Sequence, residues 1–179
     1  MRRIESPHGS IVLVVEPAGT PTFAAGRRAL CEALGEQIEI ARDDRGAPIV
    51  PRGHGSIAHK AGADRTVAAA IWSPQLVGID LERAQPPRQP IERRILTPRE
   101  QAALGADRRR VSLAFAIKEA IYKAVDPVVR RYVGFTEVEL DLEAGRATSQ
   151  LPFELAFWWT ELADPEPLWL ATARATLRS

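Results

Sequence analysis

The sequence is poor in the residue types that mark several common protein classes. It has 1 cysteine, Cys31, so it can form no internal disulfide, which agrees with a reducing compartment. Its aromatic content of 6% and net charge of +1 give little support to a nucleic-acid groove. It also lacks an apolar run near the roughly 18 residues of a membrane span, or a signal-peptide apolar core near its start. We therefore expect a globular cytoplasmic protein that binds neither nucleic acid nor membrane.

Several catalytic motifs are missing as well. The 3 histidines, His8, His54 and His59, show no metal-binding spacing. There is no Gly-x-Ser-x-Gly elbow of a hydrolase and no Walker-type phosphate loop. The sequence therefore gives no support to a histidine-held zinc centre, a serine hydrolase of that kind or a P-loop enzyme.

The order of apolar runs and breakers predicts an α+β protein with small, mostly antiparallel sheets packed on helices. A linker over residues 84–90, with three prolines, divides it into an N-terminal lobe, 1–85, and a C-terminal lobe, 86–179. Helices are expected at 23–34, after the Thr97 cap and at 109–125. Strands are expected at 11–15, 38–41, 55–59, 66–71, 76–81, 137–142, 153–159 and 168–175.

The predicted central helix carries the densest set of chemical groups. Its apolar residues recur at spacings of three and four, which predicts one buried stripe, and Pro127 is expected to help end the helix. Glu119 and Lys123 lie one turn apart on the opposite side. Taken alone, they are most simply a surface ion pair that contributes about 0.3–0.5 kcal/mol.

A second set of acids follows an apolar strand. Asp80 and Glu82 are separated by one residue, so on a strand they point to the same face, about 7 Å apart. Two like charges held so close favour a cation between them, and Mg²⁺ prefers such carboxylate oxygens. The simpler alternative is that both acids face solvent.

Residues 55–59 (Gly-Ser-Ile-Ala-His) are the third candidate. A glycine lets a phosphate approach the backbone closely, and a partly protonated His59 can donate a hydrogen bond to it. His59 could equally be a hydrogen-bonded histidine of the sheet. The arginine-rich segments nearby can meet phosphates, although such runs are usually solvated faces.

Together, the ordered motifs resemble those of the 4′-phosphopantetheinyl transferases of the surfactin-type (Sfp-like) class. The resemblance rests on residues 78–82 (Gly-Ile-Asp-Leu-Glu) and 115–123 (Phe-Ala-Ile-Lys-Glu-Ala-Ile-Tyr-Lys), and on two segments similar to the family's coenzyme A segments, 42–48 and 55–59. Residues 123–127 and 133–135 look like the siderophore-synthetase subgroup.

The resemblance implies a pseudo-twofold fold of two similar lobes. It also implies transfer of 4′-phosphopantetheine from coenzyme A to a serine of an apo acyl or peptidyl carrier protein, with release of adenosine 3′,5′-bisphosphate. A monomer is expected. By the same resemblance, Mg²⁺, or Mn²⁺, would be held by Asp80, Glu82 and Glu119, and Glu119 would also act as the base.

The remaining implied roles concern coenzyme A. Lys123 and Lys118 would neutralise its phosphates, with Lys123 counted as catalytic. The outer phosphate and adenine end of coenzyme A would be bound by Arg27, Arg42, Arg45 and His59. Gly55 and Ser56 are also implied to contact the coenzyme, where it approaches the backbone.

Three features depart from the family pattern. Ala116 stands where a Ser, Cys or Thr is common, Lys60 replaces a small residue after the histidine, and the chain between Glu16 and Phe23 looks short. The alternatives to the transferase are a coenzyme A or nucleotide-phosphate binding module without turnover and a protein-interaction scaffold without a ligand.

Overall fold

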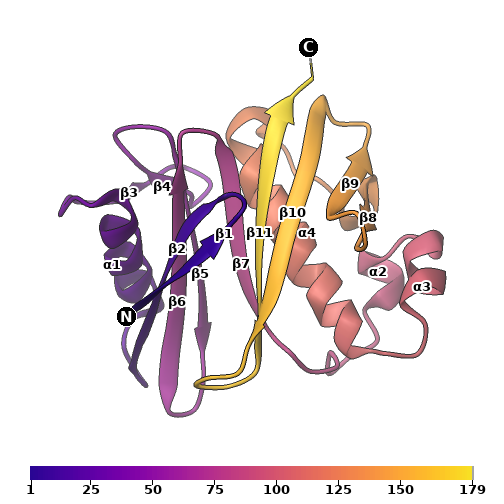
Figure 1. Ribbon diagram of the computed structural model, residues 1–179, viewed down its shortest axis with the longest axis horizontal. Coiled ribbons are helices and arrows are strands. Elements are labelled where there is room, and N and C mark those ends of the chain that lie inside the picture. Colours follow the sequence, from indigo (N-terminus) through magenta and orange to yellow (C-terminus); the bar gives the residue numbers. More distant parts are fainter. Residues whose placement is uncertain (179) are drawn as a thin grey trace.

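A computed structural model describes residues 1–178 as two antiparallel sheets that lie side by side, each covered by one long helix (Figure 1). The first sheet has the strand order β1-β2-β6-β5 and the second has the order β7-β11-β10-β9-β8. The elements of the first sheet are β1 (Arg2–Ser6), β2 (Gly9–Pro17), α1 (Thr22–Leu34), β5 (His54–Ala61) and β6 (Arg65–Ser73). Those of the second are β7 (Leu76–Arg83), α4 (Arg109–Val129), β8 (Val138–Asp141), β9 (Arg146–Ser149), β10 (Phe153–Leu162) and β11 (Leu168–Leu177).

Short elements connect these parts. A small hairpin of β3 (Ala41–Arg42) and β4 (Pro48–Ile49) stands between α1 and β5. The helices α2 (Glu92–Ile95) and α3 (Pro98–Leu104) precede α4, and a 3₁₀ turn, η1 (Phe135–Glu137), follows it. The expected mixed fold of small antiparallel sheets on helices is therefore confirmed.

The two sheets repeat one topology. In the first, β2 leads into α1, and the hairpin β5-β6 then returns so that β6 pairs with β2. In the second, β7 leads into α4, and the hairpin β10-β11 returns so that β11 pairs with β7. In both units the last strand lies between the first strand and its hairpin partner, which is the arrangement expected of two similar lobes.

The boundary between the repeats differs from the predicted one. We expected the lobes to divide at residues 85 and 86, with β7 paired to the strands before it. Instead β7 pairs with β11 along its length, so the second unit begins at Leu76. The proline-rich segment therefore lies within this unit. The prediction failed because linker composition is a local signal, whereas strand pairing depends on register and on which sheet edge is exposed.

Helix ends follow the local signals, with one exception. Gly35 ends α1 in the left-handed conformation with φ 71°, and Thr97 and Glu100 form the predicted capping box of α3. Pro127, however, lies inside α4, which continues to Val129 and ends at Arg130 with φ 52°. A proline in the last turn removes one amide donor but still allows the final residues to keep helical dihedrals.

The predicted strand list also needs correction, since it lacks β1 as well as β9. Residues 38–40 form no strand. Ile38 and Ile40 pack beside α1, so the apolar alternation that predicted a strand here reflects burial, and no neighbouring strand pairs with this segment. The strand β9 was missed because Ala147 is its one buried residue, which leaves no apolar pattern to detect.

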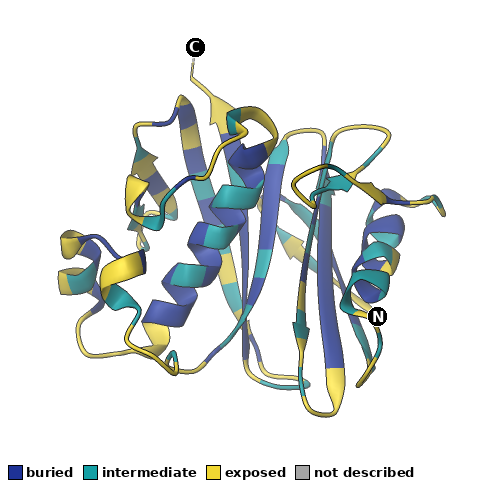
Figure 2. Cartoon of the chain, turned by 180° about the vertical axis from the view of Figure 1, so that it is seen from behind, coloured by how far each residue is buried: buried dark blue, intermediate teal, exposed yellow. Residues whose placement is uncertain are grey.

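The core has a layer under each helix and a shared layer between the sheets. The side chains of Leu13, Ile71, Ile79 and Leu170 meet in the shared layer, and buried residues line the inner face of both sheets and of α4 (Figure 2). Trp169 is buried, in agreement with a packing role. Within residues 1–178, none of the helices has the length and apolarity needed to cross a membrane.

Candidate active site

A cavity of about 670 Å³ lies between α4 and the first repeat. One wall comes from the β3–β4 hairpin and β5, and the other from the C-terminal half of α4. Seven predicted site residues line it: Arg42, Arg45, Gly55, Ser56, His59, Glu119 and Lys123. The fold therefore brings together residues that are far apart in the sequence, such as Arg45 and Asp126, which are separated by 81 positions.

The amphipathic character of α4 holds the site in place. All four residues of the predicted stripe are buried: Ile117, Ile121 and Val125 pack against the second sheet, and Ala114 packs in the cluster with α2 and α3. The opposite side presents Glu119 and Lys123 to the cavity. The apolar stripe thus fixes the rotation of the helix about its axis, and this rotation sets the direction of the polar side chains.

Lys123 connects α4 to the strand that carries the acids. Its ammonium donates to Asp80 Oδ1 at 2.7 Å and to the carbonyl oxygen of Ile79 at 3.0 Å. The ion pair between Glu119 and Lys123 that the helix spacing suggested is replaced by this contact between α4 and β7. Neither Asp80 nor Glu82 is an exposed strand-end acid, because both side chains are largely covered and ion-paired.

Gly78 allows this contact. A Cβ on Gly78 would lie 1.9 Å from the carbonyl oxygen of Ala120 and 2.7 Å from the amide nitrogen of Ala124. Both atoms are backbone of α4, so no side-chain rotation could relieve the clash. The glycine of the 78–82 motif therefore lets α4 lie close enough to β7 for Lys123 to reach Asp80.

Lys60, on β5, neutralises the second acid of β7. Its ammonium lies 2.7 Å from each carboxylate oxygen of Glu82. The first repeat thus supplies one cation to the acid pair and α4 supplies the other. The sequence does not predict this contact, because Lys60 and Glu82 lie on different strands and are 22 residues apart.

The electrostatics of the cluster raise the pKa values of two carboxyl groups. Burial raises the pKa of Asp80, while the ammonium groups of Lys123 and Lys60 oppose the shift. Burial also raises the pKa of Glu119, and the negative charges of Asp80 and Glu82 add to it. The three acids therefore lie near enough to repel one another through space.

The predicted ligands of magnesium are the carboxylates of Asp80, Glu82 and Glu119. Three carboxylates that repel one another are suitable ligands for a hard divalent cation, so the residues fit in kind. Within residues 1–178, however, no group of three or more His, Cys, Asp or Glu side chains is gathered closely enough to hold a metal ion. Lysine ammonium groups are instead the cations beside Asp80 and Glu82.

Two arginines stack on the ring of Phe23. The guanidinium of Arg42 lies 3.4 Å from the ring centroid of Phe23, and that of Arg27 lies 4.9 Å from the same centroid. Phe23 and Arg42 line the cavity, whereas Arg27 lies beside it on α1. His59 also lines it, and burial together with the charge of Lys123 lowers its pKa.

Arg45 is held by two groups on α4. Its Nε donates to the Asp126 carboxylate at 2.8 and 3.0 Å, and its Nη2 donates to the Tyr122 hydroxyl at 2.7 Å. Arg130 makes the reciprocal contact to Asp43 of the hairpin loop at 2.9 Å. Crossed ion pairs therefore fasten this loop to the end of α4. Sequence reasoning did not include Asp126 in the site. The available signal was its charge, which stands alone between Val125 and Pro127.

Gly55 and Ser56 contribute mainly to packing. Ser56 is buried, and its hydroxyl accepts a hydrogen bond from the amide of Ile79 at 3.1 Å, which ties β5 to β7. A Cβ on Gly55 would lie 2.9 Å from Val50 Cγ1 and 3.0 Å from Leu30 Cδ2. Although both residues line the cavity, the small glycine is required by its apolar neighbours.

Lys118 does not line the cavity, which corrects the prediction that it neutralises a coenzyme A phosphate. Its ammonium has no exposed area and donates to Glu100 at 2.7 Å and to three carbonyl oxygens. One of these belongs to Val138 of the edge strand β8, while the other Glu100 oxygen accepts from the amide of Leu140. The pair thus satisfies the edge of β8 where no further strand pairs with it.

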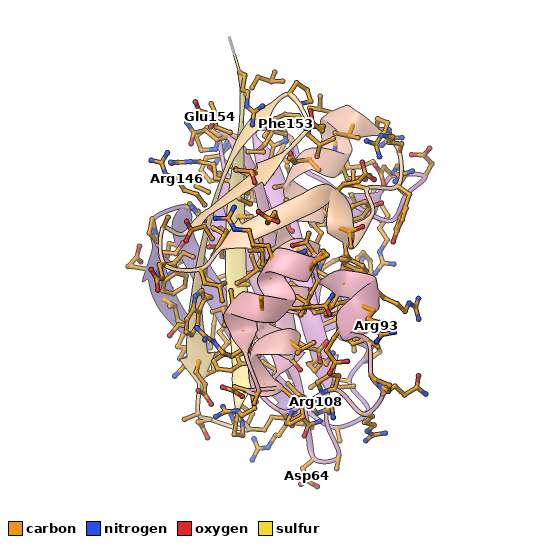
Figure 3. The ribbon with its side chains drawn as sticks, turned by 90° about the vertical axis from the view of Figure 1, so that its right-hand side faces the viewer. Asp64, Arg93, Arg108, Arg146, Phe153 and Glu154 are labelled. Atoms are coloured by element: carbon orange, nitrogen blue, oxygen red, sulfur yellow. The ribbon has the colours of Figure 1, made fainter. Side chains whose placement is uncertain are left out.

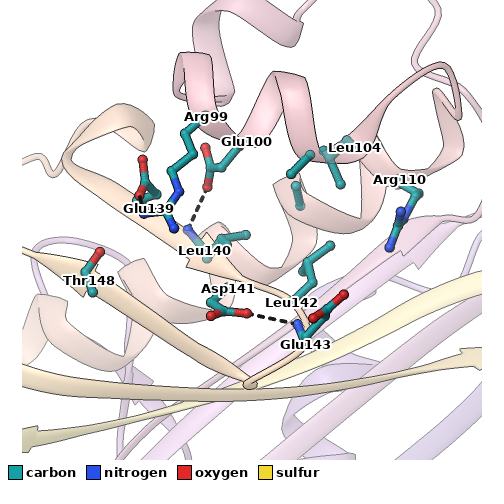
Figure 4. A pocket seen from close by; sticks show the side chains of 12 residues that line it. Arg99, Glu100, Leu104, Arg110, Glu139, Leu140, Asp141, Leu142, Glu143 and Thr148 are labelled. Atoms are coloured by element: carbon teal, nitrogen blue, oxygen red, sulfur yellow. Dashed lines mark hydrogen bonds and ion pairs between the residues drawn. The ribbon is translucent and has the colours of Figure 1, made fainter.

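A second cavity, of about 390 Å³, lies on the other side of α4, next to this buried pair. Figure 4 shows Leu104, Leu140 and Leu142 on its apolar floor, with Arg99 and Glu139 at its edge. Arg99 and Glu139 are paired at 3.1 Å. It contains none of the predicted site residues, so we assign the candidate active site to the larger cavity.

Comparison with known proteins decides the family. The sequence model of the 4′-phosphopantetheinyl transferase superfamily matches residues 76–173, more than half of the chain. The chain belongs to this superfamily. It is also 35% identical over 133 residues to the 4′-phosphopantetheinyl transferase Npt of Nocardia iowensis, a match that covers 69% of this chain and 58% of that protein. The family match begins at β7, so it contains Asp80, Glu82, Glu119 and Lys123.

Proposed function

We propose that the protein transfers 4′-phosphopantetheine from coenzyme A to a serine of an apo carrier protein. The observation that carries this proposal is the convergence of Glu119 and Lys123 of α4 with Arg42 and His59 of the first repeat in one cavity, next to Asp80. Glu119 and Lys123 supply a base and a cation beside the acids of β7, and Arg42 and His59, which can bind phosphate, line the same cavity. Transfer from a pyrophosphate requires these components.

In the proposed reaction the serine oxygen forms a bond to the phosphorus next to the pantetheine. The bond from that phosphorus to the leaving adenosine 3′,5′-bisphosphate breaks. Glu119 accepts the serine proton, directly or through water, and its pKa, raised by burial and by the charges of Asp80 and Glu82, makes it a stronger base than an exposed carboxylate. Lys123 counters the negative charge that develops on the leaving phosphate.

Asp80, Glu82 and Glu119 would hold Mg²⁺, or Mn²⁺. When bound, the metal would supply positive charge to the pyrophosphate. Arg42, with Phe23 behind its guanidinium, and His59 would bind the outer phosphate and adenine end of coenzyme A, with Arg27 and Arg45 supporting this end. Lys118 has no place in the proposed chemistry because its ammonium is enclosed.

A surface rich in arginine suits the acidic helix expected on the carrier. Figure 3 shows Arg93 and Arg108 at the surface around α2 and the start of α4. Arg108 pairs with Glu92, whereas Arg93 and Arg94 are exposed on α2. We propose docking of the carrier here, by a monomeric enzyme in the cytoplasm. The motifs at residues 78–82 and 115–123 support membership of the surfactin-type class, and residues 123–127 and 133–135 support its siderophore-synthetase subgroup.

The test is incubation with coenzyme A, Mg²⁺ and a panel of apo carriers from fatty acid, polyketide, peptide and siderophore synthesis. Mass spectrometry should show a phosphopantetheine addition to at least one carrier. Glu119→Gln should abolish this addition, whereas Glu154→Gln, which removes an exposed charge on β10, should not. Undiminished transfer by Glu119→Gln would refute its role. Calorimetric binding of coenzyme A without transfer to any carrier would favour a binding module.

A further inference from the structure

Lys60 places its ammonium group inside the acid cluster. It reaches Glu82 from β5, and its ammonium lies 2.7 Å from each carboxylate oxygen. The side chains of Lys60 and Glu82 are 24% and 21% exposed, so solvent screens this pair less than a surface pair. A protonated lysine has three donors and no lone pair, so it can occupy carboxylate oxygens but cannot itself bind a metal.

The charges of the cluster can be counted from the contacts. Asp80, Glu82 and Glu119 carry three negative charges when ionised, and Lys60 and Lys123 carry two positive charges. The Lys60 charge also acts on Asp80, two residues from its direct partner. Without Lys60 the cluster would have a charge of minus two, which a divalent cation would neutralise. With Lys60 present, the same cation leaves a net charge of plus one.

We propose that Lys60 is a built-in counter-ion that sets the affinity of the acid cluster for a divalent cation. It acts by occupying both oxygens of Glu82 and by repelling the incoming cation. Lys123 differs from it, because Lys123 also bonds to the backbone of Ile79 and lines the substrate cavity. The inference rests on the proposed function, since it takes Asp80, Glu82 and Glu119 to be the metal site.

The experiment measures binding of Mn²⁺ alone, by electron paramagnetic resonance of the free ion, in the absence of coenzyme A. Lys60→Met keeps the length of the side chain and removes its charge, whereas Lys60→Arg keeps the charge. A neighbouring charge changes the affinity of a site for a proton by roughly tenfold or more, so Lys60→Met should bind Mn²⁺ about tenfold more tightly. Lys60→Arg should bind it as the wild type does.

Arg65→Met is the matched control. Arg65 is exposed at the start of β6, and its loss changes the net charge of the protein by the same amount. It should leave the Mn²⁺ affinity unchanged. The inference is overturned if Lys60→Met binds Mn²⁺ no more tightly than the wild type does, or if Arg65→Met tightens binding equally, because a general charge effect would then explain the result.

A second readout separates charge from misfolding. In buffer with EDTA, Lys60→Met should melt below the wild type, because Glu82 loses its cation. Added Mn²⁺ should then raise its melting temperature more than it raises that of the wild type. If Lys60→Met does not fold, Lys60→Gln takes its place. A melting temperature that responds equally to Mn²⁺ in the wild type and the neutral variant overturns the inference.

The outcome is distinguishable from the fate of the proposed function. If the wild type modifies a carrier but Lys60→Met does not gain Mn²⁺ affinity, the role of Lys60 alone is refuted. If Lys60→Met gains Mn²⁺ affinity but the wild type modifies no carrier, the counter-ion role stands and the transferase proposal fails.

Discussion

Replacement of Gly78 by alanine should damage both stability and activity, although alanine adds a single methyl group. The new Cβ would lie 1.9 Å from the carbonyl oxygen of Ala120, where ordinary contact begins at 3.4 Å. The helix α4 would therefore have to withdraw from β7 by about 1.5 Å, because both clashing groups in α4 are backbone atoms. A shift of this size would lengthen the 2.7 Å contact between Lys123 and Asp80 beyond the range of an ion pair.

The magnitudes follow from these distances. Overpacking of a core costs about 1–3 kcal/mol, and a backbone clash belongs at the upper end of this range. For a chain of this size, 3 kcal/mol lowers the melting temperature by roughly 6–12 °C. A displacement of about 1 Å at a catalytic group can reduce the rate by about 100-fold. We therefore expect Gly78→Ala to melt several degrees lower and to lose most of its transfer activity.

The measurements are thermal unfolding by circular dichroism and mass spectrometry of the carrier. Gly134→Ala is the control, since Gly134 has φ −67° and the nearest atom to its added Cβ would be Glu137 Oε1 at 3.4 Å. This control should behave as the wild type in both assays. A Gly78→Ala variant that melts within 1 °C of the wild type and transfers at the same rate would refute the close-packing argument.

Three further outcomes are expected. Lys118→Met should lower the free energy of unfolding, measured in urea, by about 3–5 kcal/mol, because it leaves Glu100 charged and buried without its partner. Asp126→Asn should speed hydrogen exchange of the amides of residues 43–47, because Arg45 loses its carboxylate. Glu119→Gln should melt above the wild type at neutral pH in EDTA. The pKa of Glu119 is raised in the folded state, so protonated Glu119 favours folding at low pH. This contribution to the free energy of unfolding is lost as pH rises through the folded-state pKa.

Each of these has a contrary result that would count against its reasoning. Adding Glu100→Gln to Lys118→Met should restore stability. If it does not, the unpaired Glu100 carboxylate is not the cause of the lost stability. Unchanged exchange at residues 43–47 in Asp126→Asn would show that the loop is held by other contacts. The advantage of Glu119→Gln should disappear at acidic pH, and a constant advantage would point to packing rather than charge.

Local chemistry in the sequence determined most of the secondary structure and the chemical identity of the site. The capping box at Thr97, the stop at Gly35 and the buried stripe of α4 each depend on neighbours within a few residues, so a single pattern was sufficient to predict them. The acids of residues 78–82 and the groups of 115–123 were identified by their order and spacing. The resemblance to 4′-phosphopantetheinyl transferases, which these motifs carried, is confirmed at the level of the superfamily by the match over residues 76–173.

Tertiary structure alone decided the partners of the charged residues. Helical spacing paired Lys123 with Glu119, yet the fold pairs it with Asp80 on β7. The adjacent residues Lys118 and Glu119 have different surroundings. The ammonium of Lys118 is enclosed by the α3 and β8 segments, whereas the side chain of Glu119 lines the cavity. Spacing along a helix defines the direction in which each side chain points. Whether that side chain is buried, and which charge neutralises it, depends on the elements that pack against that side of the helix. Those elements come from distant parts of the chain, as Lys60 on β5 and Glu82 on β7 show.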